Sequence, residues 1–271
     1  MKIGFFDSGF GGLDVMSHVM DAMHEYDYVY LGDNARVPYG DKSQETIYQY
    51  TEQAMKFLCD QGCALIIVAC NTASARALRT IQQQWLPLHY PNRRILGVII
   101  PSAEEAVSET STKKIGVLAT ESTVRSTTFE QEIIKLDSAI SVFQQSCPLF
   151  VPLIENGEDN QVVWDVYISR YLAPLINNVD TLILGCTHYG IIAHRIQSYL
   201  NVHNVPITLV PQGAVTAQKT KQYLERHYEI EGVLSKEQDR EFYVTDDPSK
   251  FIRLAKQYFD LDIDPKVVSL S

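Results

Sequence analysis

The sequence predicts an α/β protein made of two pseudo-symmetric domains, each a mostly parallel sheet flanked by helices, with the active site in the cleft between them. At residues 65–75 (LIIVACNTASA) an apolar run, typical of a strand buried on both faces, ends abruptly in small polar residues. Residues 181–190 (TLILGCTHYG) repeat this arrangement, again with a cysteine at the strand end. The opening KIGFFDSG from Lys2 is likewise matched by KIGVLATES from Lys114.

The two copies are offset by nearly the same number of residues. Aligning Ile3 with Ile115 gives an offset of 112 residues, and aligning Cys70 with Cys186 gives 116. Offsets this close indicate two copies of one unit of strands and helices. The alternative is chance similarity, because buried strands are generally rich in Val, Ile and Leu.

Composition and charge narrow the class of protein. The chain has 271 residues, 45% of them hydrophobic and 21% charged, which suits a globular protein of two ordinary domains. Its net charge of −10 disfavours a general affinity for nucleic acid or an anionic membrane, and no run has the pattern of a signal peptide or membrane span. Five cysteines in a chain too long to need disulfides indicate free thiols, so we expect a cytoplasmic protein.

The first half begins with a strand at 1–6, a glycine turn (DSGFGG), a helix at 13–23 and a second strand at 28–31. The glycines permit close approach of the backbone to a ligand. A dinucleotide or phosphate loop is not indicated, because Asp14 stands where the dinucleotide pattern needs a glycine and no Lys follows.

The loop at 32–40 (GDNARVPYG) is rich in glycine and proline, which is unusual for a plain spacer. Asp33 and Tyr39 are its chemically reactive members. The alternative interpretation is a surface turn in which Asp33 only caps its own backbone.

A helix over 41–62, capped by Ser43, follows this loop. Cys59 and Cys63 lie near its end, and a metal set with Cys70 can be considered. The spacing matches no common zinc pattern, and cysteine is among the most buried residue types, so a structural role is favoured.

Helices and strands then alternate to the end of the chain. We expect helices at 73–84, 101–109, 120–136, 162–175, 191–200, 211–227 and 248–258, and strands at 95–100, 115–119, from 142, at 206–210 and, as an edge strand, at 240–247. The last elements have no counterpart in the second copy, so we expect them to return to the first domain. This gives a first domain of 1–96 plus 208–271 and a second domain of 97–207.

Two groups of side chains in the second half have two interpretations each. Thr120, Ser122 and Thr123 can cap the helix that follows, or they can hold a carboxylate. Glu155 follows an apolar stretch, so it is either a buried acid of raised pKa or a solvated side chain beside a glycine turn.

Two thiols opposed across a cleft suit one reaction especially well, which is removing a carbon-bound proton from one face of a substrate and returning one to the other. The ordinary pKa of cysteine is about 8.5, so each thiol needs a helix N-terminus or polar neighbours to favour the thiolate, and Asp7 and His188 are candidates for this role. Hydrogen bonds to a substrate carboxylate can come from side chains at the strand ends, namely Ser8, Asn71, Thr72 and Thr187.

Five motifs spread over most of the chain resemble those of the cofactor-independent glutamate racemases, in the aspartate/glutamate racemase superfamily. They are DSGFGG at 7–12, GDNARVPYG at 32–40, ACNTASA at 69–75, PLFVPLIENG at 148–157 and LGCTHYG at 184–190. The resemblance implies an isomerase that interconverts L- and D-glutamate and supplies D-glutamate for peptidoglycan. It also implies that neither a cofactor nor a metal is needed, and it leaves a homodimer as a possible assembly.

The resemblance also implies roles for individual residues. Cys70 would act as the base on D-glutamate and Cys186 as the base on L-glutamate, while Asp7, Asp33, Glu155 and His188 tune the thiols. The substrate-binding residues that it implies are Asp7, Ser8, Pro38, Tyr39, Gly40, Asn71, Thr72, Thr120, Thr187 and His188.

Three positions depart from the family pattern. Members often have Thr at the position of Asn34 and Pro at that of Gly190, and segment 210–214 is VPQGA here in place of an acidic-serine sequence. The last departure bears on helix entry and domain contacts more than on the chemistry.

Three other functions compete with this one. A racemase of another amino acid, such as aspartate, would use the same two cysteines. A carboxylate-binding protein without catalysis is disfavoured, because binding alone would accept Ser or Ala at both positions. A thiol hydrolase that uses Cys186 and His188 leaves Cys70 without a role.

Overall fold

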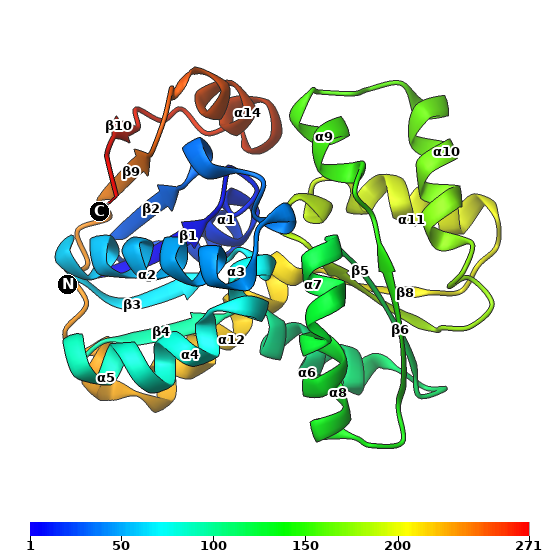
Figure 1. Ribbon diagram of the computed structural model, residues 1–271, viewed down its shortest axis with the longest axis horizontal. Helices are drawn as coiled ribbons and strands as arrows, with labels where there is room; N and C mark the ends of the chain where they lie inside the picture. The colour runs from blue at the N-terminus through cyan, green and yellow to red at the C-terminus, as the bar shows by residue number, and fades with distance from the viewer. Residues whose placement is uncertain (271) are drawn as a thin grey trace.

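The computed structural model describes residues 1–270 and contains two parallel sheets, each accompanied by helices (Figure 1). The first sheet has the strand order β10-β9-β2-β1-β3-β4, and the second has the order β6-β5-β7-β8. The strands of the first sheet are β1 (Lys2–Asp7), β2 (Tyr28–Gly32), β3 (Cys63–Val68), β4 (Arg94–Gly97), β9 (Arg240–Val244) and β10 (Lys266–Val267). Those of the second are β5 (Lys114–Ala119), β6 (Ser141–Ser146), β7 (Thr181–Gly185) and β8 (Thr208–Val210). The predicted α/β class is confirmed.

The helices divide between the two sheets, and we call the two parts the first half and the second half. The first half contains α1 (Leu13–Ala22), the 3-10 turns η1 (Asn34–Arg36) and η2 (Tyr39–Asp41), α2 (Gln44–Asp60), α3 (Asn71–Arg76), α4 (Leu78–Thr80), the π-helical turn η3 (Ile81–Trp85), α5 (Leu86–His89), α12 (Gln212–Arg226), α13 (Tyr228–Glu231) and α14 (Ser249–Phe259). The second half contains α6 (Ile99–Glu109), α7 (Glu121–Ser126), α8 (Thr128–Leu136), α9 (Phe150–Glu155), α10 (Gln161–Leu172), η4 (Thr187–Gly190) and α11 (Ala193–Val202).

The strand order reproduces the internal repeat of the sequence. The run β2-β1-β3-β4 in the first sheet has the same connectivity as β6-β5-β7-β8 in the second, so β1 corresponds to β5 and β3 to β7. Every residue of β3 and of β7 is buried, as the continuous apolar runs predict. Cys70 and Cys186 therefore follow equivalent strands.

One boundary of the predicted domain division disagrees with the strand pairing. Strand β8 pairs with β7, so residues 208–210 belong to the second sheet, as β4 belongs to the first beside β3. The expected division placed these residues in the first domain, because the sequence of a short strand does not indicate which sheet the strand joins. The return to the first half comes at α12, which packs against α1.

Several element boundaries also differ from the expected ones. The strand expected at 95–100 ends at Gly97, and α6 already begins at Ile99, because the apolar run continues across the strand end into the helix. The helix expected at 73–84 begins at Asn71 and continues as α4, the π-helical turn and α5. β9 is not an edge strand, since β10 pairs with it. The expected cap at Ser43 is present: its hydroxyl accepts a hydrogen bond from the Thr46 N–H at 3.2 Å.

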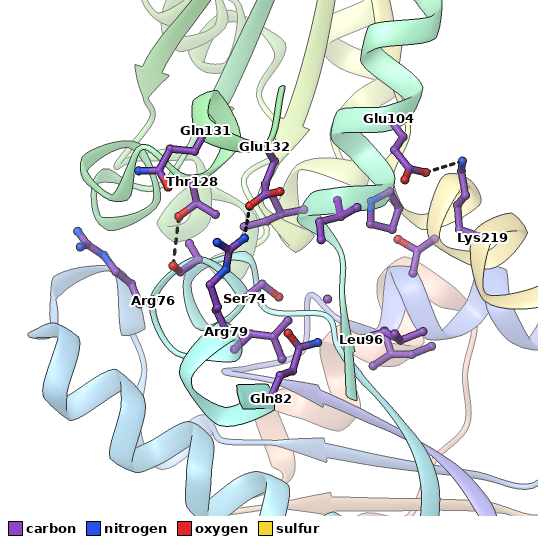
Figure 2. A pocket seen from close by; sticks show the side chains of 18 of the residues that line it. Ser74, Arg76, Arg79, Gln82, Leu96, Glu104, Thr128, Gln131, Glu132 and Lys219 are labelled. Atoms are coloured by element: carbon purple, nitrogen blue, oxygen red, sulfur yellow. Dashed lines mark hydrogen bonds and ion pairs between the residues drawn. The ribbon is translucent and has the colours of Figure 1, made fainter. Parts of the chain in front are cut away.

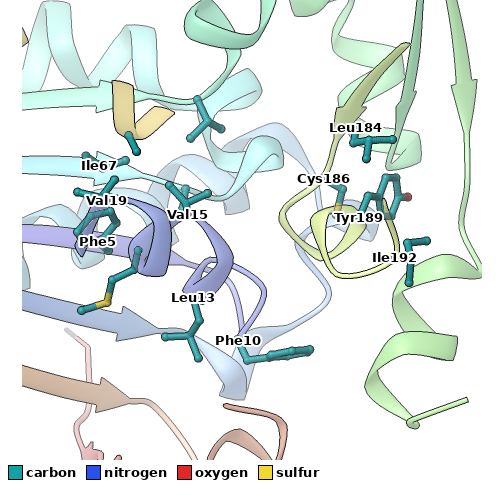
Figure 3. Close-up of a cluster of buried hydrophobic side chains, with 14 of the residues drawn as sticks. Phe5, Phe10, Leu13, Val15, Val19, Ile67, Leu184, Cys186, Tyr189 and Ile192 are labelled. Carbon is teal, nitrogen blue, oxygen red and sulfur yellow. The ribbon is translucent and has the colours of Figure 1, made fainter. Parts of the chain in front are cut away.

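A continuous apolar core joins the two halves. One buried cluster contains Phe10 and Val15 from the first half together with Leu184, Tyr189 and Ile192 from the second (Figure 3). The chain crosses between the halves twice, once between β4 and α6 and once between β8 and α12, and these two helices pack on each other. Among residues 1–270, no helix combines the length and apolar character needed to cross a membrane.

Candidate active site

Cys70 lies where β3 passes into α3, at the junction with the second half. Its Sγ accepts a hydrogen bond from the Ala73 N–H at 3.5 Å and lies 3.6 Å from Ser8 Oγ. The residue is 4% exposed. The strand end thus places the thiol beside the turn that follows β1.

The surroundings of Cys70 keep its thiol protonated at neutral pH. Burial and the nearby Asp7 carboxylate raise the pKa of Cys70 to about 12. The hydrogen bonds from Ala73 and Ser8 act in the opposite direction but do not offset these two effects. The expectation that the helix N-terminus favours the thiolate therefore identifies a real contribution, but its net direction is wrong, because burial of the thiol and the Asp7 charge outweigh it.

Cys186 follows β7 and begins a row of polar side chains. Its Sγ lies 4.0 Å from His188 Nδ1, and His188 Nε2 lies 3.2 Å from Glu155 Oε1. Lys250 of α14, from the first half, donates to Glu155 Oε2 at 2.6 Å. Burial lowers the pKa of His188, but the contacts with Cys186 and Glu155 prevail and raise it to about 10. His188 is therefore an imidazolium at neutral pH and can donate toward both neighbours.

Glu155 is neither the acid of raised pKa nor the solvated side chain considered from the sequence. Burial raises its pKa, yet hydrogen bonds from His188 and Lys250 outweigh burial and bring the pKa down to about 2. Its side chain is only 18% exposed. The raised-pKa alternative is wrong because the two cationic partners, His188 and Lys250, come from segments distant in the sequence.

Asp7, the last residue of β1, forms a hydrogen bond that links the first half to the second. One of its oxygens accepts the Gly9 N–H at 2.9 Å, and the other accepts the Thr187 hydroxyl at 3.3 Å. Burial raises the pKa of Asp7, although the charge of His188 opposes this. Asp7 is thus placed to interact with groups near both thiols.

The position of Gly11 in the turn after β1 requires a residue without a side chain. A Cβ at this position would lie 2.6 Å from His188 Nδ1 and 2.7 Å from Thr187 Oγ1, which is too close for any side chain. The turn therefore permits close approach of the η4 loop, whereas the sequence suggested close approach of a ligand.

Other residues implied by the resemblance meet across the same junction. The hydroxyls of Thr72 and Thr120 lie 3.0 Å apart, and Thr120 also caps α7 through the Thr123 N–H. A Cβ at Gly40 would be 3.4 Å from the Cβ of Thr120. Pro38 precedes η2 and joins Val37 through a cis peptide bond. The hydroxyl of Thr120 thus serves as a cap and also faces the first half.

Asp33 is fully buried, so the surface-turn interpretation is wrong. It accepts hydrogen bonds from the Tyr39 hydroxyl, from Arg36 Nε at 2.6 Å and from the Thr245 hydroxyl at 2.8 Å. Burial and the Asp33 charge raise the pKa of Tyr39. These contacts make Asp33 an anchor for Tyr39.

The overall fold agrees with comparisons to known proteins. The sequence model of the Asp/Glu/hydantoin racemase family matches residues 11–219. The chain belongs to this family. It is thus an enzyme of the racemase class, an isomerase, and its close relatives carry the same two-sheet architecture.

Individual relatives match almost the whole racemase chain. It is 40% identical over 269 residues to a glutamate racemase of Aquifex aeolicus, covering 99% of this chain and 98% of that protein. A glutamate racemase isoform from Bacillus anthracis superposes with a TM-score of 0.90 at 30% identity, covering 99% and 97% of the two chains. The glutamate racemase of Francisella tularensis, solved with D-glutamate, gives a TM-score of 0.87 at 31% identity, covering 99% and 97%.

The sequence did not identify the partner of Asn71 in this racemase. The Asn71 side chain is paired with Gln212 of α12 through hydrogen bonds of 2.6 and 3.0 Å. The two residues are 141 positions apart. The only signal in the sequence is that Gln212 lies in the segment 210–214, which departs from the family pattern.

Cys59 and Cys63 are free, buried thiols, as the structural interpretation predicts. Burial raises the pKa of each to about 12, and both pack in the apolar cluster around α2 and β3. They therefore contribute packing in this racemase, with no role in the junction.

A cavity of about 510 Å³ is lined by residues from both halves (Figure 2). It borders the C-terminal part of α3, and ion pairs Arg79–Glu132 and Lys219–Glu104 line it at 2.5 and 2.6 Å. Neither Cys70 nor Cys186 is among the residues that line this cavity.

Proposed function

We propose that this chain is a glutamate racemase that interconverts L- and D-glutamate by two-base proton transfer, with Cys70 and Cys186 as the bases and without a cofactor. The observation that carries the proposal is that equivalent strands, β3 and β7, each deliver one cysteine to the same junction. The names of the relatives support glutamate as the substrate, and one of them was solved with D-glutamate bound.

The resemblance to the glutamate racemases supports one task for each thiol. Cys70 acts on D-glutamate, and Cys186, whose Sγ lies 4.0 Å from His188 Nδ1, acts on L-glutamate. One thiolate removes the α-proton, and the other thiol returns a proton to the opposite face. A bound α-ammonium group near Cys70 would lower the pKa of the thiol, which burial and Asp7 hold at about 12 in the absence of substrate.

The carbanion formed in this step places charge on the substrate carboxylate. The hydroxyls of Ser8, Thr72 and Thr187 lie at the strand ends of the junction, where they can donate hydrogen bonds to that carboxylate. We propose that Asp33 positions Tyr39 by accepting a hydrogen bond from its hydroxyl, and that Glu155 positions His188 in the same way.

The cellular role we propose is the supply of D-glutamate for peptidoglycan in the cytoplasm, which the five free thiols suit. We also propose a homodimer, which light scattering of the purified protein tests.

The test is circular dichroism of the purified protein with L- or D-glutamate and no added cofactor. We expect the signal to decay toward zero from both enantiomers. Activity that is lost on dialysis and restored by pyridoxal phosphate would contradict the proposal. The same assay with L-aspartate distinguishes an aspartate racemase, because the two cysteines would serve either substrate.

The geometry disfavours the thiol hydrolase. Such a hydrolase would use Cys186 and His188 alone, and it would leave Cys70, which follows the equivalent strand β3, without a role. The raised pKa of His188 suits a role as a partner of the Cys186 thiolate.

A further inference from the structure

A buried amide pair joins Asn71, next to Cys70, to the first residue of α12. Asn71 Nδ2 donates to Gln212 Oε1 at 2.6 Å, and Gln212 Nε2 donates to Asn71 Oδ1 at 3.0 Å. Asn71 is 2% exposed and Gln212 is 4% exposed. Because each amide both donates to and accepts from the other, neither can rotate by half a turn without replacing two hydrogen bonds by two repulsions.

Gln212 also forms hydrogen bonds that link the two segments in which the chain crosses between the halves. Its Nε2 lies 3.1 Å from Ser102 Oγ and 3.5 Å from the Val98 carbonyl oxygen. The Ser102 hydroxyl donates to the same carbonyl at 2.8 Å, which leaves its lone pairs free to accept from Gln212. Val98 follows β4 at the first crossing, and Gln212 begins α12 at the second. One side chain therefore ties both crossings to the segment that carries Cys70.

We propose that Gln212 is a positioning residue for racemisation. The amide pair occupies Asn71 Oδ1 and one of the two Nδ2 hydrogens, so it leaves one Nδ2–H, on the residue next to Cys70, free to donate to another group. The proposal rests on the proposed function and on the role in substrate binding that the resemblance implies for Asn71. Without Gln212, Asn71 can turn its oxygen toward a substrate carboxylate, which repels it, and substrate binding weakens.

The variant Gln212→Met tests this, because it keeps the length of the side chain and removes the amide. We expect kcat/KM for glutamate to fall about tenfold, mainly through a higher KM, as loss of a hydrogen bond that orients a binding group predicts. Gln218→Met is the matched control, since Gln218 is exposed on the same helix, and it should behave as the unmodified protein.

A double-mutant cycle with Asn71→Ala separates positioning from a general structural effect. If Gln212 acts through Asn71, Gln212→Met should change kcat/KM less than about twofold when Asn71 is already Ala. Independent, multiplicative losses in the cycle, or an unchanged KM in Gln212→Met, would overturn the proposal. All assays are run below the unfolding midpoint of every variant, and Gln212→Glu, which keeps the acceptor but not the donor, replaces Gln212→Met if that variant does not fold.

The outcomes also separate this proposal from the function on which it rests. If the unmodified protein does not racemise glutamate, the proposed function fails and the role of Gln212 fails with it. If the unmodified protein is active and the cycle shows no coupling, only the role of Gln212 is refuted.

Discussion

The pH dependence of stability tests the row of charges that runs from His188 through Glu155 to Lys250. Burial lowers the pKa of His188, but Cys186 and Glu155 raise it from 6.5 to about 10 in the folded protein. A group whose pKa rises on folding stabilises the folded state while it is protonated there. Its contribution is therefore complete below pH 6.5 and is lost as the pH rises toward 10.

The size of this effect follows from the two pKa values. A difference from 6.5 to about 10 corresponds to at most about 5 kcal/mol, of which about 3 to 4 kcal/mol disappears between pH 6.5 and pH 9.5. The pKa of Glu155 is about 2, so its carboxylate stays charged throughout this range. Glu155 therefore adds no titration of its own between pH 6.5 and pH 9.5.

The variant Glu155→Gln removes the charge that faces the imidazolium and keeps the shape of the side chain. We expect the free energy of unfolding to fall by about 2 kcal/mol at pH 6.5, the typical value of a hydrogen bond between charged groups, and by less than about 1 kcal/mol at pH 9.5. Glu109→Gln is the control, because Glu109 is exposed on α6.

Urea unfolding at pH 6.5, 8 and 9.5 provides these free energies by linear extrapolation. Other titrating groups occur in both proteins, so they cancel in the difference between the variant and the unmodified chain. If Glu155→Gln lowers stability equally at all three pH values, the assignment of a raised pKa to His188 through Glu155 is wrong.

Two further predictions concern the thiols and the glycine turn. Cys70→Ser and Cys186→Ser should each lower the rate of racemisation about 10²–10⁴-fold without unfolding the protein. A glutamate analogue with a leaving group on the β-carbon then tests the thiol that remains. Cys186→Ser should still catalyse elimination from the D-like analogue only, and Cys70→Ser from the L-like analogue only. Substantial racemase activity in either variant, or the same enantiomer preference in both, would show that the thiols do not serve one face each. Gly11→Ala should cost about 1–3 kcal/mol in urea unfolding, because its Cβ would lie 2.6 Å from His188 Nδ1, whereas Gly9→Ala meets only an ordinary contact at 3.6 Å and should cost much less. Equal losses in the two glycine variants would contradict the close packing of the η4 loop on the turn.

The sequence predicts the features that depend on local pattern. Continuous apolar runs identified β3 and β7, and the repeated KIG strand starts indicated the correspondence of β1 with β5 that the strand order shows. The helix caps at Ser43 and Thr120 were equally accessible, because a capping side chain bonds to its own first turn. The start of α6 at Ile99 could not be predicted, since an apolar run that continues from a strand into a helix has no break in its pattern.

The sequence alone determined that two equivalent strands each end in a cysteine, because burial on both faces and the residue that follows are written in consecutive positions. Only the tertiary structure decided what surrounds those cysteines. Lys250 reaches Glu155 across 95 positions, and Gln212 reaches Asn71 across 141. The charge state of His188 and the orientation of the Asn71 amide are set by these contacts, and a pKa or an amide orientation depends on neighbours in space that no local pattern records.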